Sequence, residues 1–180
     1  MFGDTKQSTF GDQSPNINGD GNVILYGTKN KLANEVETML KVIILIPEVA
    51  RERGISSDDV EYSKDLLKKI NERFTVYQSE LKNRFNNLDL LYRNSYEDAK
   101  RNTDIDEFGF EEMCSYLRNI SIEILKFNDG NPLLALKEIC RILETKFSNG
   151  TEENFSAEAI EYFLYKQLVE CNIFPNPTQI

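Results

Sequence analysis

Residues 57–92 decide the fold and read SDDVEYSKDLLKKINERFTVYQSELKNRFNNLDLLY. Large apolar side chains recur along this stretch at intervals of three or four residues: Leu67, Ile70, Phe74, Tyr77, Leu81, Phe85, Leu88 and Tyr92. This spacing places them on one face of an α-helix. Neither glycine nor proline occurs between Gly54 and Gly109, so the helical pattern is uninterrupted. We predict a helix of roughly 35 residues, about 50 Å long, that packs in an intramolecular bundle, with a bend at Asn86-Asn87.

Shorter segments with the same periodicity follow and precede this helix, and capping residues divide them. These residues are Pro47 and Gly54 at the end of the first helix, Ser95 with Asp98 at the start of a short one, Asn131 and Pro132 at the start of another, Gly150 at its end, and Ser156 before the last. The sequence therefore predicts a mostly α fold, a bundle of about six helices. We expect three parts: a leader over residues 1–29, a connecting helix and linker over 30–54, and a helical domain over 55–180.

The leader is rich in Gly, Asp, Asn, Ser and Thr and contains a repeat. Its related triplets, eight residues apart, are Phe2-Gly3-Asp4, Phe10-Gly11-Asp12, Asn18-Gly19-Asp20 and Tyr26-Gly27-Thr28. An even period returns equivalent residues to the same face of an extended chain. Two interpretations stay open: a disordered polar leader, or a short β-like element that pairs within an oligomer or with a partner's sheet edge. Residues 22–26 are the best strand candidate.

The composition disfavours several classes of function. The formal net charge is -9 and no domain-sized segment is strongly basic, so direct binding of nucleic acid is not expected, only contact through a partner. The chain has no histidine, which excludes HExxH zinc sites and Ser-His or Cys-His pairs. It also lacks a phosphate loop and a GxGxxG motif. We therefore predict no enzyme, no catalytic residue, no metal and no cofactor.

The cysteines and the apolar segments indicate the compartment. Cys114, Cys140 and Cys171 are widely spaced and odd in number, which is typical of reduced core residues. The longest aliphatic run, residues 42–46, ends at Pro47, and we identify neither a secretory signal nor a membrane span. We expect a cytoplasmic protein.

Two apolar segments at the ends of the chain are the candidate partner-binding residues. The first is Val23, Ile24, Leu25 and Tyr26 in the leader; the second is Ile173 and Phe174, just beyond the last helix and before Pro175. Proline blocks continuation of the helix, so the second pair either folds back as a plug or forms a docking hook. We predict that both segments are exposed anchors for other proteins.

Three stretches resemble a known group of proteins. Residues 11–23, GDQSPNINGDGNV, resemble the leader on components of bacterial ABC-three-component conflict systems, the group that includes Lamassu. The C-terminal region is similar to the small helical domain of those systems. Its matching segments are Tyr96-Glu97-Asp98-Ala99, Asn131-Pro132-Leu133-Leu134-Ala135-Leu136 and Cys171-Asn172-Ile173-Phe174-Pro175. The resemblance covers about residues 10–25 and 75–177.

The resemblance implies a role in anti-phage defence. Such systems combine an SMC-like coiled-coil ATPase, an effector that is often a nuclease, and a small middle component. A chain of 180 residues has no room for the first two, so the resemblance implies the middle component. This accessory subunit would link the ATPase to the effector and restrain the effector until foreign DNA triggers release. The alternative is a self-assembling protein that forms a homo-oligomer through its leader repeats.

Overall fold

The computed structural model describes residues 26–58, 60–150, 155–170 and 173–174. Its five helices are α1 (Tyr26–Glu52), α2 (Lys64–Asn102), α3 (Glu107–Phe127), α4 (Pro132–Gly150) and α5 (Ala157–Val169). The described part of the chain contains no strand, so the prediction of a mostly α fold is confirmed. Residues 1–25, with the predicted β-like repeats, lie outside the described residues.

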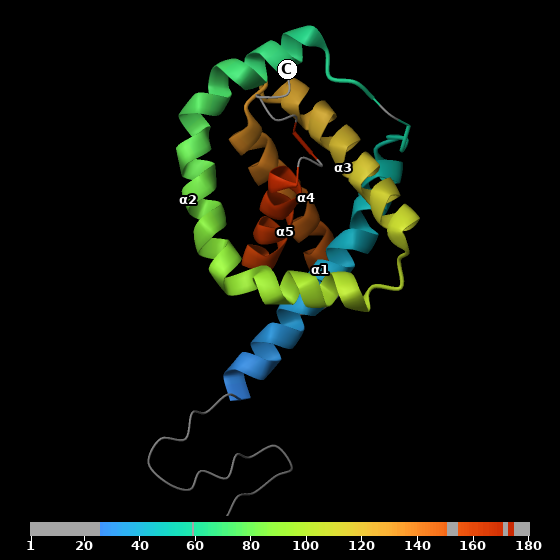
Figure 1. The fold of residues 1–180 in the computed structure, drawn as a ribbon. Helices are drawn as coiled ribbons and strands as arrows, with labels where there is room; N and C mark the ends of the chain where they lie inside the picture. Colours follow the sequence, from blue (N-terminus) through green and yellow to red (C-terminus); the bar gives the residue numbers. More distant parts are fainter. Residues whose placement is uncertain (1–25, 59, 151–154, 171–172, 175–180) are drawn as a thin grey trace, which may run out of the picture.

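The helices form a ring around a central pair. Figure 1 shows α2 following a curved path along one side of the molecule, while α1 and α3 close the other side and α4 and α5 lie within. α1 packs against α2, α3 and α5, and α5 packs against α2 and α4. Apolar residues of all five helices therefore share one continuous core.

α1 continues through Pro47, where the sequence predicted its end. The apolar stripe Met39, Val42, Ile43, Ile46, Val49 and Ala50 is buried on both sides of the proline. This burial outweighs the missing hydrogen bond of one proline, whose φ fits a helix. The helix ends at Glu52, and Gly54, which the sequence also marked at this end, lies just beyond it with a φ of 69°. There the Ile55 amide donates to the Ala50 carbonyl at 2.9 Å, a C-terminal cap that requires a left-handed residue.

α2 is longer than predicted because Ser95 is not a helix cap. The Ser63 side chain caps α2 by accepting from the Leu66 amide, and 39 residues of continuous helix follow, through Asn86 and Asn87. Ser95 is fully buried on this helix and its hydroxyl donates to Glu35 of α1 at 2.9 Å. The predicted separate helix at Ser95 and Asp98 is therefore wrong: both residues lie within α2, and Ser95 pairs with Glu35 of α1.

The other predicted starts are confirmed. Asn131 lies directly before α4, which opens with Pro132. Its side-chain oxygen accepts hydrogen bonds from the amides of Leu133 and Leu134, both in the first turn of the helix. The Ser156 hydroxyl accepts from the Ala159 amide at the start of α5. These local caps fix where α4 and α5 begin.

Candidate protein-binding surface

The predicted C-terminal anchors are not exposed. Ile173 and Phe174 are both buried, and the Tyr62 hydroxyl donates a hydrogen bond to the Ile173 carbonyl. The prediction of an exposed docking hook is therefore wrong, and the pair folds back onto the bundle as a plug. The physical reason is that burying these two large side chains against the core removes more apolar surface from water than an extended tail would.

The predicted leader anchors lie almost entirely outside the described residues. Val23, Ile24 and Leu25 precede the described part of the chain. Tyr26 is the first residue of α1, and its side chain is not described. Their partner-binding role stays a prediction.

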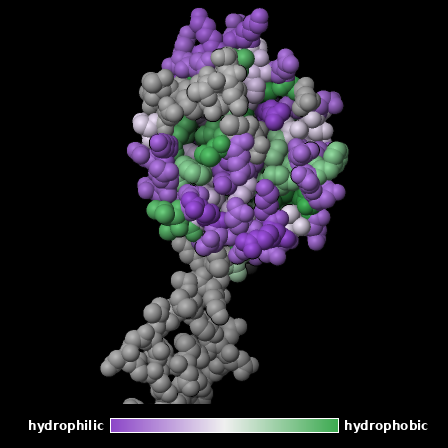
Figure 2. Space-filling view, viewed as in Figure 1, coloured by the Kyte–Doolittle hydropathy of each residue, from purple (hydrophilic) through white to green (hydrophobic). Residues whose placement is uncertain are grey.

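A pair of exposed leucines stands on the outward side of α2. Leu90 is 85% exposed and Leu91 is 64% exposed, while Leu88 and Tyr92 beside them are buried in the core. Figure 2 shows hydrophobic residues at the lower left of the molecule, over the curve of α2. The helical periodicity of the sequence indicates this exposure, because a helix that buries residues 88 and 92 turns residues 90 and 91 away from the core.

The leucine pair is bordered by asparagines on the outward side of α2, and by the exposed Arg93 at one edge. Its neighbours at helical spacing are the exposed residues Asn83, Asn86, Asn87 and Asn94. We call these four asparagines, together with Leu90 and Leu91, the neutral face of α2. The charged residues between positions 83 and 94 are Arg84, Asp89 and Arg93; Asp89 is buried, and the two arginines lie at the edges of this uncharged set. Apolar centres with few charges are typical of protein interfaces.

Two arginines flank the neutral face, and both are engaged elsewhere. Arg84 donates to Glu161 of α5 through two hydrogen bonds, of 2.9 and 2.6 Å. Arg93 donates to Asp89 one turn earlier on α2. Each guanidinium is therefore held at the margin of the face by its own carboxylate.

A second apolar surface lies where α3 meets α4. Phe127, the last residue of α3, is 83% exposed, and Leu134 in the first turn of α4 is 46% exposed. We call this pair the α3–α4 corner. Figure 1 places the turn at the top of the molecule, far along α2 from the neutral face.

The turn at the corner is held to α2. Lys69 donates to Asp129 at 2.6 Å, and Arg73 pairs with the other oxygen of the same carboxylate. These two cations lower the pKa of Asp129. Asp129 and Gly130 have φ values of 51° and 71°, so the turn adopts a left-handed conformation that few other sequences would support. The corner is thus presented by a fixed turn.

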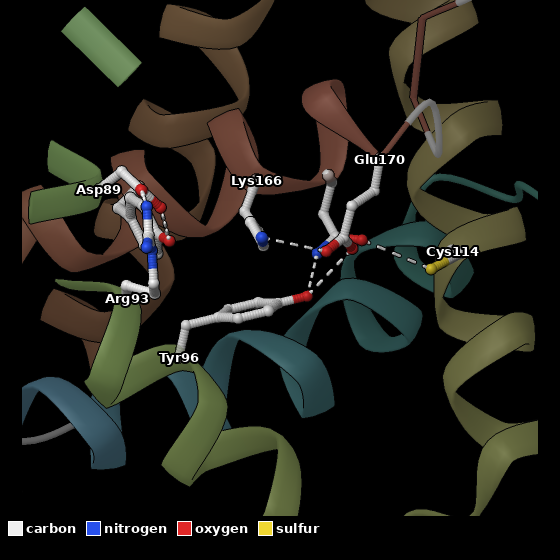
Figure 3. A network of polar contacts seen from close by, with 8 residues as sticks. Asp89, Arg93, Tyr96, Cys114, Lys166 and Glu170 are labelled. Carbon is white, nitrogen blue, oxygen red and sulfur yellow. Dashed lines mark hydrogen bonds and ion pairs between the residues drawn. The ribbon is translucent and has the colours of Figure 1, made fainter. Parts of the chain in front are cut away.

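A partly buried polar network joins α2, α3 and the end of α5 (Figure 3). Tyr96 accepts from the Gln167 amide at 3.0 Å and donates to Glu170 at 3.3 Å, while the Cys114 thiol donates to Gln167 at 3.6 Å. Lys166 pairs with Glu170 at 3.4 Å and lies 5.6 Å from the centre of the Tyr96 ring. Burial is the main reason that the pKa of Tyr96 is raised. Each of these side chains contacts another member of the network, so the network links α2, α3 and α5.

The described thiols are poor nucleophiles. Burial raises the pKa of Cys114 to about 11 and that of Cys140 to about 12. Both are free and lie against the core, as the sequence predicted, and at neutral pH both are protonated. Cys171 lies outside the described residues.

One cleft lies between α4 and α5 and has a volume of about 340 Å³. Its lining includes Leu136, Cys140 and Leu164 together with acidic and basic residues. Among the described residues, no group of three or more Cys, Asp or Glu side chains is arranged to hold a metal ion. No described helix combines the length and apolarity that crossing a membrane requires.

Comparisons with known protein families, with curated proteins and with solved structures found no match for this chain.

Proposed function

We propose that this chain is a non-catalytic accessory subunit that binds other proteins through the α3–α4 corner. The observation that carries the proposal is the exposure of Phe127 and Leu134 on either side of a turn that ion pairs hold to α2. Exposed aromatic side chains on rigid elements are typical anchors of protein interfaces, because little freedom is lost when they are buried.

The biological setting of the proposal is bacterial anti-phage defence, and it rests on the resemblance to ABC-three-component systems. In that setting the partners are an SMC-like ATPase and an effector of the nuclease class, and the subunit links the two and restrains the effector. The acidic net charge supports a role in which nucleic acid is reached only through the partners.

The experiment is co-expression with the neighbouring genes, followed by affinity purification and mass measurement of whatever stays bound. The test variant is Phe127→Glu/Leu134→Glu, and the control is Leu90→Glu/Leu91→Glu, which makes the same change on the neutral face. We expect a stable complex with a coiled-coil ATPase or an effector, lost in the test variant and kept in the control. A chain that purifies without either partner would contradict the accessory role; equal binding by both variants would contradict the corner as its site.

The alternative function is self-assembly through the leader repeats, for which residues 1–25 are required. Deleting these residues would then dissociate an oligomer formed by the full chain. An unchanged mass after the deletion would exclude this alternative.

A further inference from the structure

We propose that the neutral face of α2 is a contact between two copies of this chain. This contact is separate from the α3–α4 corner and goes beyond the accessory function. The occupant of the face is the same face of a second molecule, related by a twofold axis.

The spacing of the face is that of a seam between two helices. Asn83, Asn87, Leu90 and Asn94 follow one another at intervals of four, three and four residues. Alternating steps of three and four place side chains along a single line where one helix meets another. The core stripe of α2 already faces inward, so this second line is directed outward and is free to meet another molecule.

The charge of the chain favours this face for self-association. With 30 acidic and 21 basic residues, two copies repel each other over most of their surfaces. A face without charge lets two copies approach closely without placing like charges opposite each other.

The chemistry of the face is self-complementary. A twofold contact brings the same patch together from both sides, so its groups must satisfy copies of themselves. Leucine packs on leucine, and an asparagine amide both donates and accepts hydrogen bonds. Of the charged residues between 83 and 94, Asp89 is buried, and Arg84 and Arg93 are each paired with a carboxylate of this chain, so the face fits a second copy better than a strongly charged protein.

The seam asparagines indicate a specific contact of modest strength. Polar residues at seam positions lower the stability of paired helices while fixing their register and number. α2 is held to α5 along this stretch, by Arg84 on Glu161 and by the buried hydrogen bond from Tyr162 to Asp89 at 2.7 Å. Little ordering is then needed when two copies meet.

The first test is the molecular mass of the full chain over a wide range of concentration, by sedimentation equilibrium. We expect the mass to rise from 20.8 kDa to twice that value in the wild type. The variant Leu90→Glu/Leu91→Glu should stay a monomer, while Phe127→Glu/Leu134→Glu should dimerise like the wild type. A wild type that is monomeric throughout, or a Leu90→Glu/Leu91→Glu variant that still dimerises, would overturn the proposal.

The second test strengthens the seam instead of breaking it. Asn94→Leu extends the apolar part of the line, so the midpoint of dimerisation should shift to a concentration lower by about tenfold. Helical circular dichroism establishes that the variant is folded. An unchanged or higher midpoint would overturn the contact. Neither test depends on capture of another protein, so a failure of the dimer contact in these tests would not contradict the accessory function.

Discussion

At the scale of the residue, Asp89 joins α2 to α5. Its carboxylate accepts from the Tyr162 hydroxyl at 2.7 Å and from Arg93. Tyr162→Phe removes one donor and leaves a buried acceptor less satisfied, so we expect a loss of about 1–2 kcal/mol in the free energy of unfolding. Urea denaturation measures this difference in the free energy of unfolding. Tyr116→Phe is the control, because its hydroxyl makes no hydrogen bond to the described residues. Equal losses in both variants would show that the Asp89 bond adds nothing.

The same carboxylate predicts a pH dependence. The hydrogen bond from Arg93, followed by that from Tyr162, lowers the pKa of Asp89 in the folded protein. Its contribution to stability is therefore present above the unfolded value of about 3.9 and is lost as the pH falls through the folded pKa. Between pH 7 and pH 3, we expect Asp89→Asn to lose less stability than the wild type. Asp129 and Glu138 titrate in the same direction in both proteins, so the difference isolates Asp89; identical pH profiles would contradict the assignment.

Two glycines with the same backbone conformation differ in the space around them. Gly130 has a φ of 71°, and a Cβ there would lie 2.6 Å from the Lys69 Cβ; Gly54 has a φ of 69° and open space. Alanine costs about 1–2 kcal/mol at either position through left-handed strain. Gly130→Ala must also displace α2 from the α3–α4 turn, so it should lose at least about 1 kcal/mol more than Gly54→Ala. Chemical denaturation of the two variants gives the comparison, and equal losses would mean that the turn adapts.

At the scale of the element, local signals were enough for some boundaries and insufficient for others. Asn131-Pro132 and Ser156 mark real helix starts because a cap is satisfied within its own turn. Ser95 carries the same kind of signal, yet its hydroxyl is taken by Glu35, sixty residues away. A single sequence contains no information on that partner. The prediction that the first helix ends at Pro47 was wrong for a related reason. The helix continues because residues on both sides of Pro47 are buried, and this burial depends on the whole bundle.

The tail shows the same limit and supports a further prediction. The sequence left a plug and a hook as alternatives for Ile173 and Phe174, and only tertiary packing decides between them. Because Phe174 is 2% exposed, Phe174→Ala should destabilise the protein by about 3 kcal/mol. Phe108→Ala is the matched control, since Phe108 is 75% exposed and its loss should fall within about 0.5 kcal/mol. Thermal unfolding of the two variants compares their losses of stability. A small loss at Phe174 would show that the tail leaves the bundle in solution.

At the scale of the whole molecule, the candidate surfaces consist of large apolar side chains that the core does not bury. The core stripe of α2 was predictable from periodicity, and so was its outward side by subtraction, which makes Leu90 and Leu91 recoverable from the sequence. The α3–α4 corner was not recoverable, because the exposure of Phe127 and Leu134 depends on how α2 binds the turn through Lys69 and Arg73.

The shared core also predicts how the molecule unfolds. Met39, Val42 and Ile46 of α1 are buried in the same cluster as residues of α3 and α5. We therefore expect residues 30–54 to unfold together with the rest, in one transition. The chain has no tryptophan, so tyrosine fluorescence reports mainly on α2 and α5, where Tyr92, Tyr96 and Tyr162 pack together. Far-UV circular dichroism reports on all the helices.

The two signals should give the same midpoint in urea, because α1 cannot leave without exposing the core on which the tyrosines depend. The measurement uses Leu90→Glu/Leu91→Glu as well as the wild type, since a dimer that dissociates during unfolding would make the midpoint depend on protein concentration. A circular dichroism transition that precedes the fluorescence change in both proteins would show that α1 is a separate unit. Coincident transitions in the variant, with a concentration-dependent midpoint only in the wild type, would place the dimer contact on α2 and leave the bundle cooperative without it.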